Sequence, residues 1–104
     1  DDLTVPLLSL GAKGVISVLS NVRPKRTLQM VRACQAGDYA AAGRMQVALT
    51  PLIDALFSEI NPIPVKQALS LMGIPAGLPR LPLTPLSATH LPALEQALSA
   101  APEP

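Results

Sequence analysis

Residues 14–24 decide the fold, and they read GVISVLSNVRP. The segment from Val15 to Leu19 is mostly apolar and partly β-branched, without a polar face, which is typical of a strand covered on both sides in a parallel sheet. A short polar loop follows, and Pro24 suits the first turn of a helix. The stretch therefore predicts a buried strand over 14–19 and a helix over 24–36.

A single strand needs neighbours, because its backbone N–H and C=O groups otherwise stay unpaired. No other part of the 104 residues has the pattern of a partner strand. We therefore expect residues outside this sequence to complete the sheet, so that the chain is the end of a larger α/β fold.

The composition supports the same expectation. Hydrophobic residues make up 49% of the chain and its mean hydropathy is +0.38. Charged residues make up only 14%, below the roughly 25% of ordinary soluble domains. So much apolar surface predicts burial against a part of the protein that lies outside this sequence.

Charge and residue usage argue against several classes of partner. The net charge of +1 gives no electrostatic footprint for nucleic acid or an anionic membrane, and Tyr39 and Phe57 are the only aromatic residues. No apolar run approaches the ~18 residues of a transmembrane helix, and the sequence starts without the pattern of a signal peptide. The single Cys34 predicts a reduced, packed thiol and therefore a cytoplasmic protein.

Most of the remaining chain has helical periodicity. We expect helices over about 2–10, 38–59, 62–73 and 88–100, with an irregular, proline-rich connector over 74–87 and a loose tail over 101–104.

The longest of these helices carries the clearest pattern. In the helix expected over 38–59, apolar residues spaced three and four positions apart form a stripe along one face. This apolar stripe predicts four buried residues, namely Leu49, Leu52, Ile53 and Leu56. Arg44 and Gln46 are expected to be exposed. Asp38 is expected to cap the helix and Pro51 to kink it.

No residue of the chain is expected to be catalytic or to bind a metal, and no cofactor is expected. His90 is predicted to be an exposed first-turn residue, and Asp1-Asp2 lacks a constrained geometry for acid–base chemistry. Lys13 precedes the strand, at the end that a barrel uses for stability. Lys25 and Lys66 fall in first helical turns, where we expect them to be solvated.

The carboxyl end of the predicted strand is the more promising place for a site. Ligands of parallel α/β folds gather at the carboxyl ends of the strands. Alternation puts Ile16 and Val18 on one face of the strand, near that end. These residues are therefore expected to lie closest to any ligand.

Three motifs together resemble the C-terminal part of the dihydrodipicolinate synthase family. They are GVISV at 14–18 followed by SNV at 20–22, NPIPVK at 61–66, and LPLTP at 81–85. Their order and spacing match over essentially the whole chain, and the middle motif is the most specific.

The resemblance implies a (β/α)8 barrel with an appended helical subdomain. Residues 1–36 would end the barrel, with 2–10 as its seventh helix, 14–19 as its eighth strand and 24–36 as its eighth helix. Residues 37–104 would form the C-terminal helical subdomain.

The implied reaction condenses pyruvate, held as a Schiff base on a lysine, with aspartate semialdehyde in lysine (diaminopimelate) biosynthesis. Ile16 matches the isoleucine of strand eight beside the pyruvate site, so it is the one predicted substrate-binding residue. Asp1-Asp2 would match the end of a Gly-Asp-Asp turn. The Schiff-base lysine and its partners would lie upstream, so the chain alone is expected to be inactive. The complete protein is expected to be a homo-oligomer.

Two alternatives stay open. Related barrel lyases, such as N-acetylneuraminate lyase or keto-deoxy sugar-acid aldolases, share the architecture. A non-enzymatic helical interaction module belongs to a different class, and it would need a partner for 15–19 that the sequence does not offer.

Overall fold

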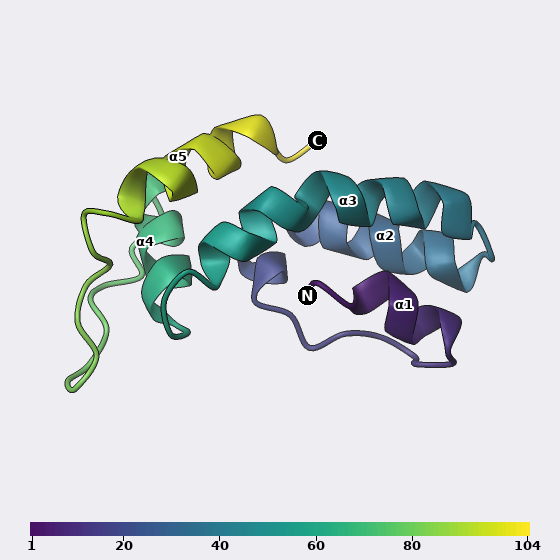
Figure 1. Ribbon diagram of the computed structural model, residues 1–104, viewed down its shortest axis with the longest axis horizontal. Helices are drawn as coiled ribbons and strands as arrows, with labels where there is room; N and C mark the ends of the chain where they lie inside the picture. The colour runs from purple at the N-terminus through teal and green to yellow at the C-terminus, as the bar shows by residue number, and fades with distance from the viewer.

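Five α-helices and one 3-10 helix make up the regular structure in the computed structural model, which describes all 104 residues (Figure 1). Their bounds are α1 Thr4–Ser9, η1 Leu19–Asn21, α2 Pro24–Gln35, α3 Tyr39–Leu56, α4 Ile63–Leu71 and α5 Leu91–Ala100. The predicted helices are thus present, with ends shifted by a few residues, as is usual at fraying termini.

The long helix α3 organises the molecule. α1 and α2 pack beside its N-terminal half, whereas α4 and α5 lie near its C-terminal half (Figure 1). The resulting body measures 41 × 26 × 22 Å. Pro51 lies inside α3, which is bent in Figure 1, as expected for a helix that lacks one N–H donor.

The turn between α2 and α3 follows directly from the sequence. Gly37 has a φ of +81°, a left-handed conformation that glycine adopts without steric cost, and it ends α2. The Asp38 side chain then accepts a hydrogen bond of 2.9 Å from the backbone N–H of Ala41. The predicted cap of α3 is confirmed.

The core lies where α3 meets η1, α2, α4 and α5. All four predicted residues of the α3 stripe are at most 2% exposed and belong to this core, namely Leu49, Leu52, Ile53 and Leu56. They pack in one cluster with Leu19, Val22, Met30, Val65, Leu94 and Leu98. The predicted apolar face of α3 is therefore confirmed.

Gln46 is a correction to the prediction, because it is only 8% exposed, whereas Arg44 is exposed as predicted. Gln46 lies three residues before Leu49 and four after Ala42, so helical spacing places it on the buried face. Its amide is satisfied there, since Oε1 accepts from the N–H of Val5 at 3.2 Å and Nε2 donates to the carbonyl of Asp1 at 3.1 Å.

No strand forms over 14–19 within this chain, so the expected strand stays a prediction for the longer protein. Residues 12–17 have no regular secondary structure, and Leu19 belongs to η1. The backbone N–H groups of residues 13–16 make no backbone hydrogen bond. The physical reason is the absence of a partner strand within the chain, since a strand exists only as part of a ladder.

The last residues of the sequence are the second correction, because they are docked on the body of the molecule and do not form the loose tail that was predicted. Ala101 is buried, and the Glu103 carboxylate accepts a hydrogen bond from the backbone N–H of Lys25 at the start of α2. Periodicity alone could not reveal this contact, since it joins residues 78 positions apart.

The division into residues 1–36 and 37–104 stays a prediction. α2 and α3 lie on opposite sides of that boundary and pack against each other.

Candidate functional site

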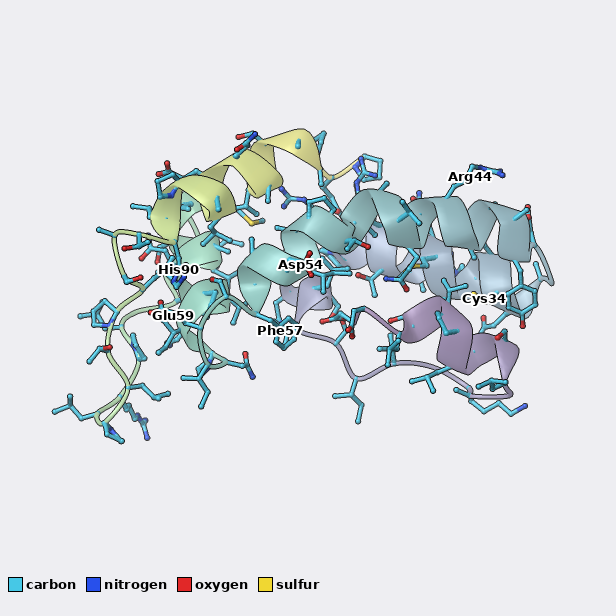
Figure 2. The ribbon with its side chains drawn as sticks, viewed as in Figure 1. Cys34, Arg44, Asp54, Phe57, Glu59 and His90 are labelled. Carbon is cyan, nitrogen blue, oxygen red and sulfur yellow. The ribbon has the colours of Figure 1, made fainter.

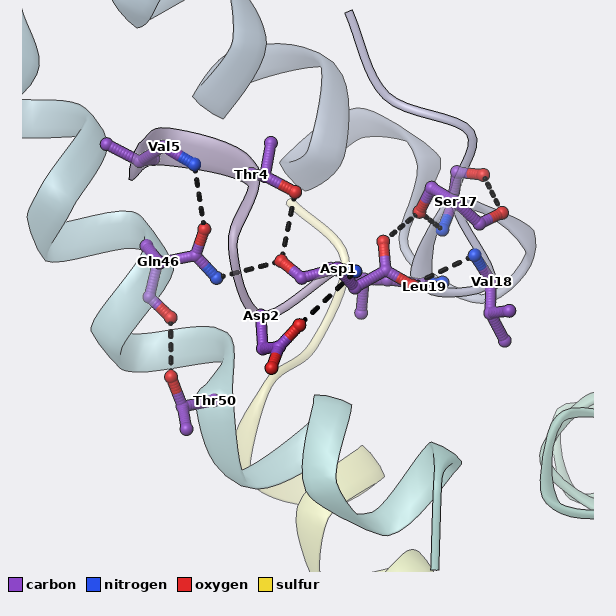
Figure 3. Close-up of polar contacts among 10 residues, drawn as sticks. Asp1, Asp2, Thr4, Val5, Ser17, Val18, Leu19, Gln46 and Thr50 are labelled. Carbon is purple, nitrogen blue, oxygen red and sulfur yellow. Dashed lines mark hydrogen bonds and ion pairs between the residues drawn. The ribbon is translucent and has the colours of Figure 1, made fainter. Parts of the chain in front are cut away.

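The candidate site is the junction between the irregular segment 12–17 and η1. The Asp1 carboxylate organises this junction (Figure 3). It accepts hydrogen bonds from the hydroxyl of Ser17 and from the backbone N–H groups of Val18 and Leu19, the latter two at 2.9 Å. The carboxylate thereby holds the first residues of the η1 turn.

This geometry corrects the expectation that Asp1 is unconstrained. The Asp1 side chain is only 2% exposed, whereas that of Asp2 is 71% exposed. A buried carboxylate is tolerated only where donors replace water, and three donors do so here. Asp1 acts as an acceptor for the turn, and the two adjacent acids do not converge on one ligand.

Hydrogen bonds between side chains and backbone groups of residues 17–21 also stabilise the η1 turn. The Ser17 hydroxyl oxygen accepts from the backbone N–H of Ser20 at 2.9 Å, and the Ser20 hydroxyl donates to the carbonyl of Ser17 at 3.0 Å. The Asn21 amide donates to the carbonyl of Val18 at 3.1 Å. Hydroxyl and amide side chains that bond nearby backbone groups favour turns, which explains why the apolar run ends in η1.

A second set of contacts connects the junction to α3. The backbone carbonyl of Asp1 accepts from the Thr4 hydroxyl at 2.9 Å and from the Gln46 amide at 3.1 Å (Figure 3). Gln46 in turn holds the N–H of Val5 in α1. The position of Asp1, and with it η1, is therefore fixed by the middle of α3.

Ile16, the predicted substrate-binding residue, lies directly before this junction. Its side chain is fully exposed, at 105% of the reference value. It borders a hollow of about 320 Å³ that is also lined by Leu3, Leu7 and Val15. Such a surface offers apolar contact, and its two polar side chains, Asp1 and Thr4, are engaged in hydrogen bonds within the chain.

The lysines do not converge on this hollow. Lys25 is exposed, as expected, and Lys13 is exposed too. Lys66 is a correction, because it is half-buried and its ammonium donates to the carbonyl of Ala76 at 2.6 Å. The contact ties α4 to the connector after it, so Lys66 has a structural role.

Cys34 and His90 lie at opposite ends of the molecule (Figure 2). Cys34 is 4% exposed, and burial raises the pKa of its thiol. His90 is half-buried, with Nδ1 at 3.1 Å from the Ser87 hydroxyl and 3.8 Å from Glu59 Oε1. The two residues therefore form no cysteine–histidine pair, and His90 is less exposed than predicted.

No three His, Cys, Asp or Glu side chains gather where they could hold a metal ion. None of the helices has the length and apolar character needed to cross a membrane.

Comparison with solved structures defines the class of protein. A crystal structure described as a dihydrodipicolinate synthase aligns with 94% of this chain at 48% identity and a TM-score of 0.91. The enzyme of that name from Thermotoga maritima aligns at 43% identity with a TM-score of 0.90. These relatives are (β/α)8 barrel proteins, and the match covers 34% and 33% of their chains.

The sequence comparison then defines the family. Residues 1–101 match the Dihydrodipicolinate synthetase family, and the chain belongs to that family. It is 53% identical over 90 residues to the 4-hydroxy-tetrahydrodipicolinate synthase of Methanosarcina barkeri, covering 86% of this chain and 31% of the relative. It is 51% identical over 100 residues to that of an Exiguobacterium species, covering 92% and 34%. The chain thus spans about a third of the length of the curated relatives it matches.

Proposed function

We propose that the chain is part of a Schiff-base-forming lyase that condenses pyruvate with aspartate semialdehyde in lysine (diaminopimelate) biosynthesis. The observation that carries the proposal is the family match over residues 1–101. The chain is 53% and 51% identical in sequence to two relatives named 4-hydroxy-tetrahydrodipicolinate synthase. A related solved structure from Acinetobacter baumannii, 40% identical to this chain, is described as complexed with pyruvate.

The proposed reaction needs an amine that this chain does not place at the hollow. A lysine amine would attack the ketone carbon of pyruvate and expel water, which forms an imine. The adjacent carbon would then lose a proton and attack the aldehyde carbon of aspartate semialdehyde. Because Lys13, Lys25 and Lys66 lie elsewhere, the proposal assigns the reactive lysine to the longer protein that contains this chain.

The proposal gives Ile16 a binding role. Its exposed side chain would contact the apolar part of bound pyruvate, once the rest of a barrel surrounds the hollow. Residues 14–19 would then join a ladder as the eighth strand. The N–H groups of residues 13–16, which make no backbone hydrogen bond, support this, as do exposed apolar side chains beside the segment, such as Leu3, Leu7 and Leu28.

The proposed division places the end of the barrel at residues 1–36 and the helical subdomain at 37–104. We further propose that the complete protein is a cytoplasmic homo-oligomer. The lone buried Cys34 supports a reducing compartment, and sedimentation of the complete protein tests the oligomeric state.

Borohydride trapping tests the proposed function. The complete protein is incubated with pyruvate and reduced with borohydride, which converts an imine into a stable secondary amine. We expect a covalent mass increase at one lysine outside these 104 residues, and turnover with aspartate semialdehyde but not with N-acetylneuraminate. No pyruvate-dependent adduct would refute the proposal, and turnover of N-acetylneuraminate would point to the related lyases.

A further inference from the structure

Arg23 is the most constrained cation of the chain. It lies between η1 and α2, and it is only 5% exposed. One terminal nitrogen of its guanidinium donates to the carbonyl of Val22 at 2.6 Å, and the other donates to the carbonyl of Leu98 at 2.7 Å. Nε donates to the carbonyl of Ala101. All three nitrogens of the fork are therefore used, each on a backbone carbonyl.

Two of these carbonyls belong to the end of α5. The last carbonyls of a helix have no partner within the helix and carry partial negative charge, so a buried cation is favourable there. Arg23 satisfies Leu98 and Ala101 at that end. Because the guanidinium is planar and rigid, it fixes both the distance and the orientation between the start of α2 and α5.

The residues after α5 add to the same connection. The Glu103 carboxylate accepts from the N–H of Lys25, and Arg26 Nε donates to the carbonyl of Pro102. Burial lowers the pKa of Arg23, whereas the charge of Glu103 acts in the opposite direction. The start of α2 is therefore attached to the α5 end by contacts from Arg23, Lys25 and Arg26.

A backbone hydrogen bond of Arg23 connects these contacts at the end of α5 to η1. The N–H of Arg23 donates to the carbonyl of Leu19 at 2.8 Å, while the Asp1 carboxylate holds the N–H of Leu19 at 2.9 Å. Leu19 and Val22 are fully buried in the main core. The turn that follows Ile16 is thus held at its start by Asp1 and at its end by Arg23.

We propose that Arg23 is a positioning residue for substrate binding. Fastened to the carbonyls at the end of α5, it fixes η1 and, through it, the placement of Ile16 toward pyruvate. This inference rests on the proposed function, and it assigns the α5 end a part in the geometry of the site although α5 contributes no side chain to the hollow.

The test uses Arg23→Lys in the complete protein. Lysine keeps the charge but has a single nitrogen, which cannot reproduce the fixed fork of the guanidinium. Because Ile16 is proposed only to bind, the expected result is a KM for pyruvate raised by roughly 3- to 10-fold with kcat within about 2-fold. The KM for aspartate semialdehyde is expected to stay unchanged. Arg32→Lys, at an exposed position of α2, is the matched control.

Amide exchange separates positioning from a general structural role. In Arg23→Lys we expect faster exchange over residues 18–23, with the exchange of α3 unchanged. Equal acceleration throughout the protein, or a pyruvate KM equal to that of the wild type, would overturn the inference. If the wild type forms no pyruvate adduct, the proposed function has failed. Amide exchange of η1 in Arg23→Lys then still shows whether Arg23 holds η1 against the end of α5.

Discussion

At the scale of single residues, buried polar side chains connect the candidate site to the rest of the molecule. Asp1 holds the start of η1, and Gln46 holds both Asp1 and α1. A buried polar group without partners costs free energy, whereas a satisfied one specifies a unique arrangement. These residues therefore define where the η1 turn lies relative to α3.

Gln46→Leu in the complete protein should lower the free energy of unfolding. The substitution leaves the Val5 N–H without its side-chain partner and removes one of the donors to the Asp1 carbonyl, at a cost of about 1–3 kcal/mol. Arg44→Leu, on the exposed side of the same helix, should change it by less than about 0.5 kcal/mol. Denaturant unfolding of both variants checks this, and equal effects would mean that the Gln46 contacts contribute nothing.

Under the proposed function, Ile16→Ala in the complete protein should raise the KM for pyruvate with kcat within about 2-fold, because an apolar contact is lost without loss of a reacting group. Pyruvate-dependent borohydride trapping should persist. If trapping disappears in a folded variant, Ile16 has more than a packing role.

Cys34 should make stability depend on pH in the alkaline range. Burial raises the pKa of its thiol, so the folded state favours the neutral form. The resulting stabilisation is fully present below the unfolded pKa of about 8.5 and is lost as the pH rises through the higher folded pKa. Denaturant midpoints of the wild type and Cys34→Ala at pH 7 and pH 10 check this. We expect the wild type to lose more stability than the variant, and parallel losses would contradict the prediction.

At the scale of elements, α3 is the helix on which the others assemble. Its core stripe contacts residues from η1, α2, α4 and α5, so a change there affects the whole body. The stripe follows from the spacing of apolar residues, and the same spacing determines the buried place of Gln46.

Leu52→Ala should destabilise the complete protein by about 2–5 kcal/mol, because it removes buried methyl groups and leaves a cavity. Val47→Ala on the same helix is the control, since Val47 is 73% exposed and its truncation should cost little. Thermal or denaturant unfolding measures both. A loss below about 0.5 kcal/mol for Leu52→Ala would show that another face of α3 is buried.

At the scale of the whole molecule, the helices share one buried core, whereas the extended segment 12–17 has no strand paired with it. Segment 12–17 makes no ladder, and large apolar side chains beside it are exposed. An unpaired extended segment of this kind is a route to aggregation.

The isolated 104-residue chain should therefore be inactive and prone to associate. Amides of residues 13–16 should exchange rapidly in the isolated chain and slowly in the complete protein, where the proposed ladder pairs them. Exchange measurements, sedimentation and borohydride trapping check this. A monodisperse monomer with slow exchange over 13–16 would contradict the proposed barrel edge, and an adduct on Lys13, Lys25 or Lys66 would show that the catalytic lysine is in this chain.

The helices and their apolar faces follow from local features of the amino-acid sequence. The signals that define the helices are local: the spacing of apolar residues and the helix-end residues Pro24, Gly37 and Asp38. The hydrogen bonds of a helix and of its cap join residues only a few positions apart. The three motifs were likewise enough to indicate the family, which the comparison over residues 1–101 confirms.

The hydrogen bonds of the buried polar side chains, by contrast, depend on how distant segments come together in the folded molecule. Three polar side chains can be buried because backbone carbonyl or N–H groups of distant segments form hydrogen bonds with them, namely those of Asp1, Arg23 and Gln46. No local sequence pattern encodes such distant partners. Residues 14–19 form no strand within this chain for a related physical reason. A helix satisfies its backbone within its own segment, whereas a strand at 14–19 depends on neighbours that the chain does not contain.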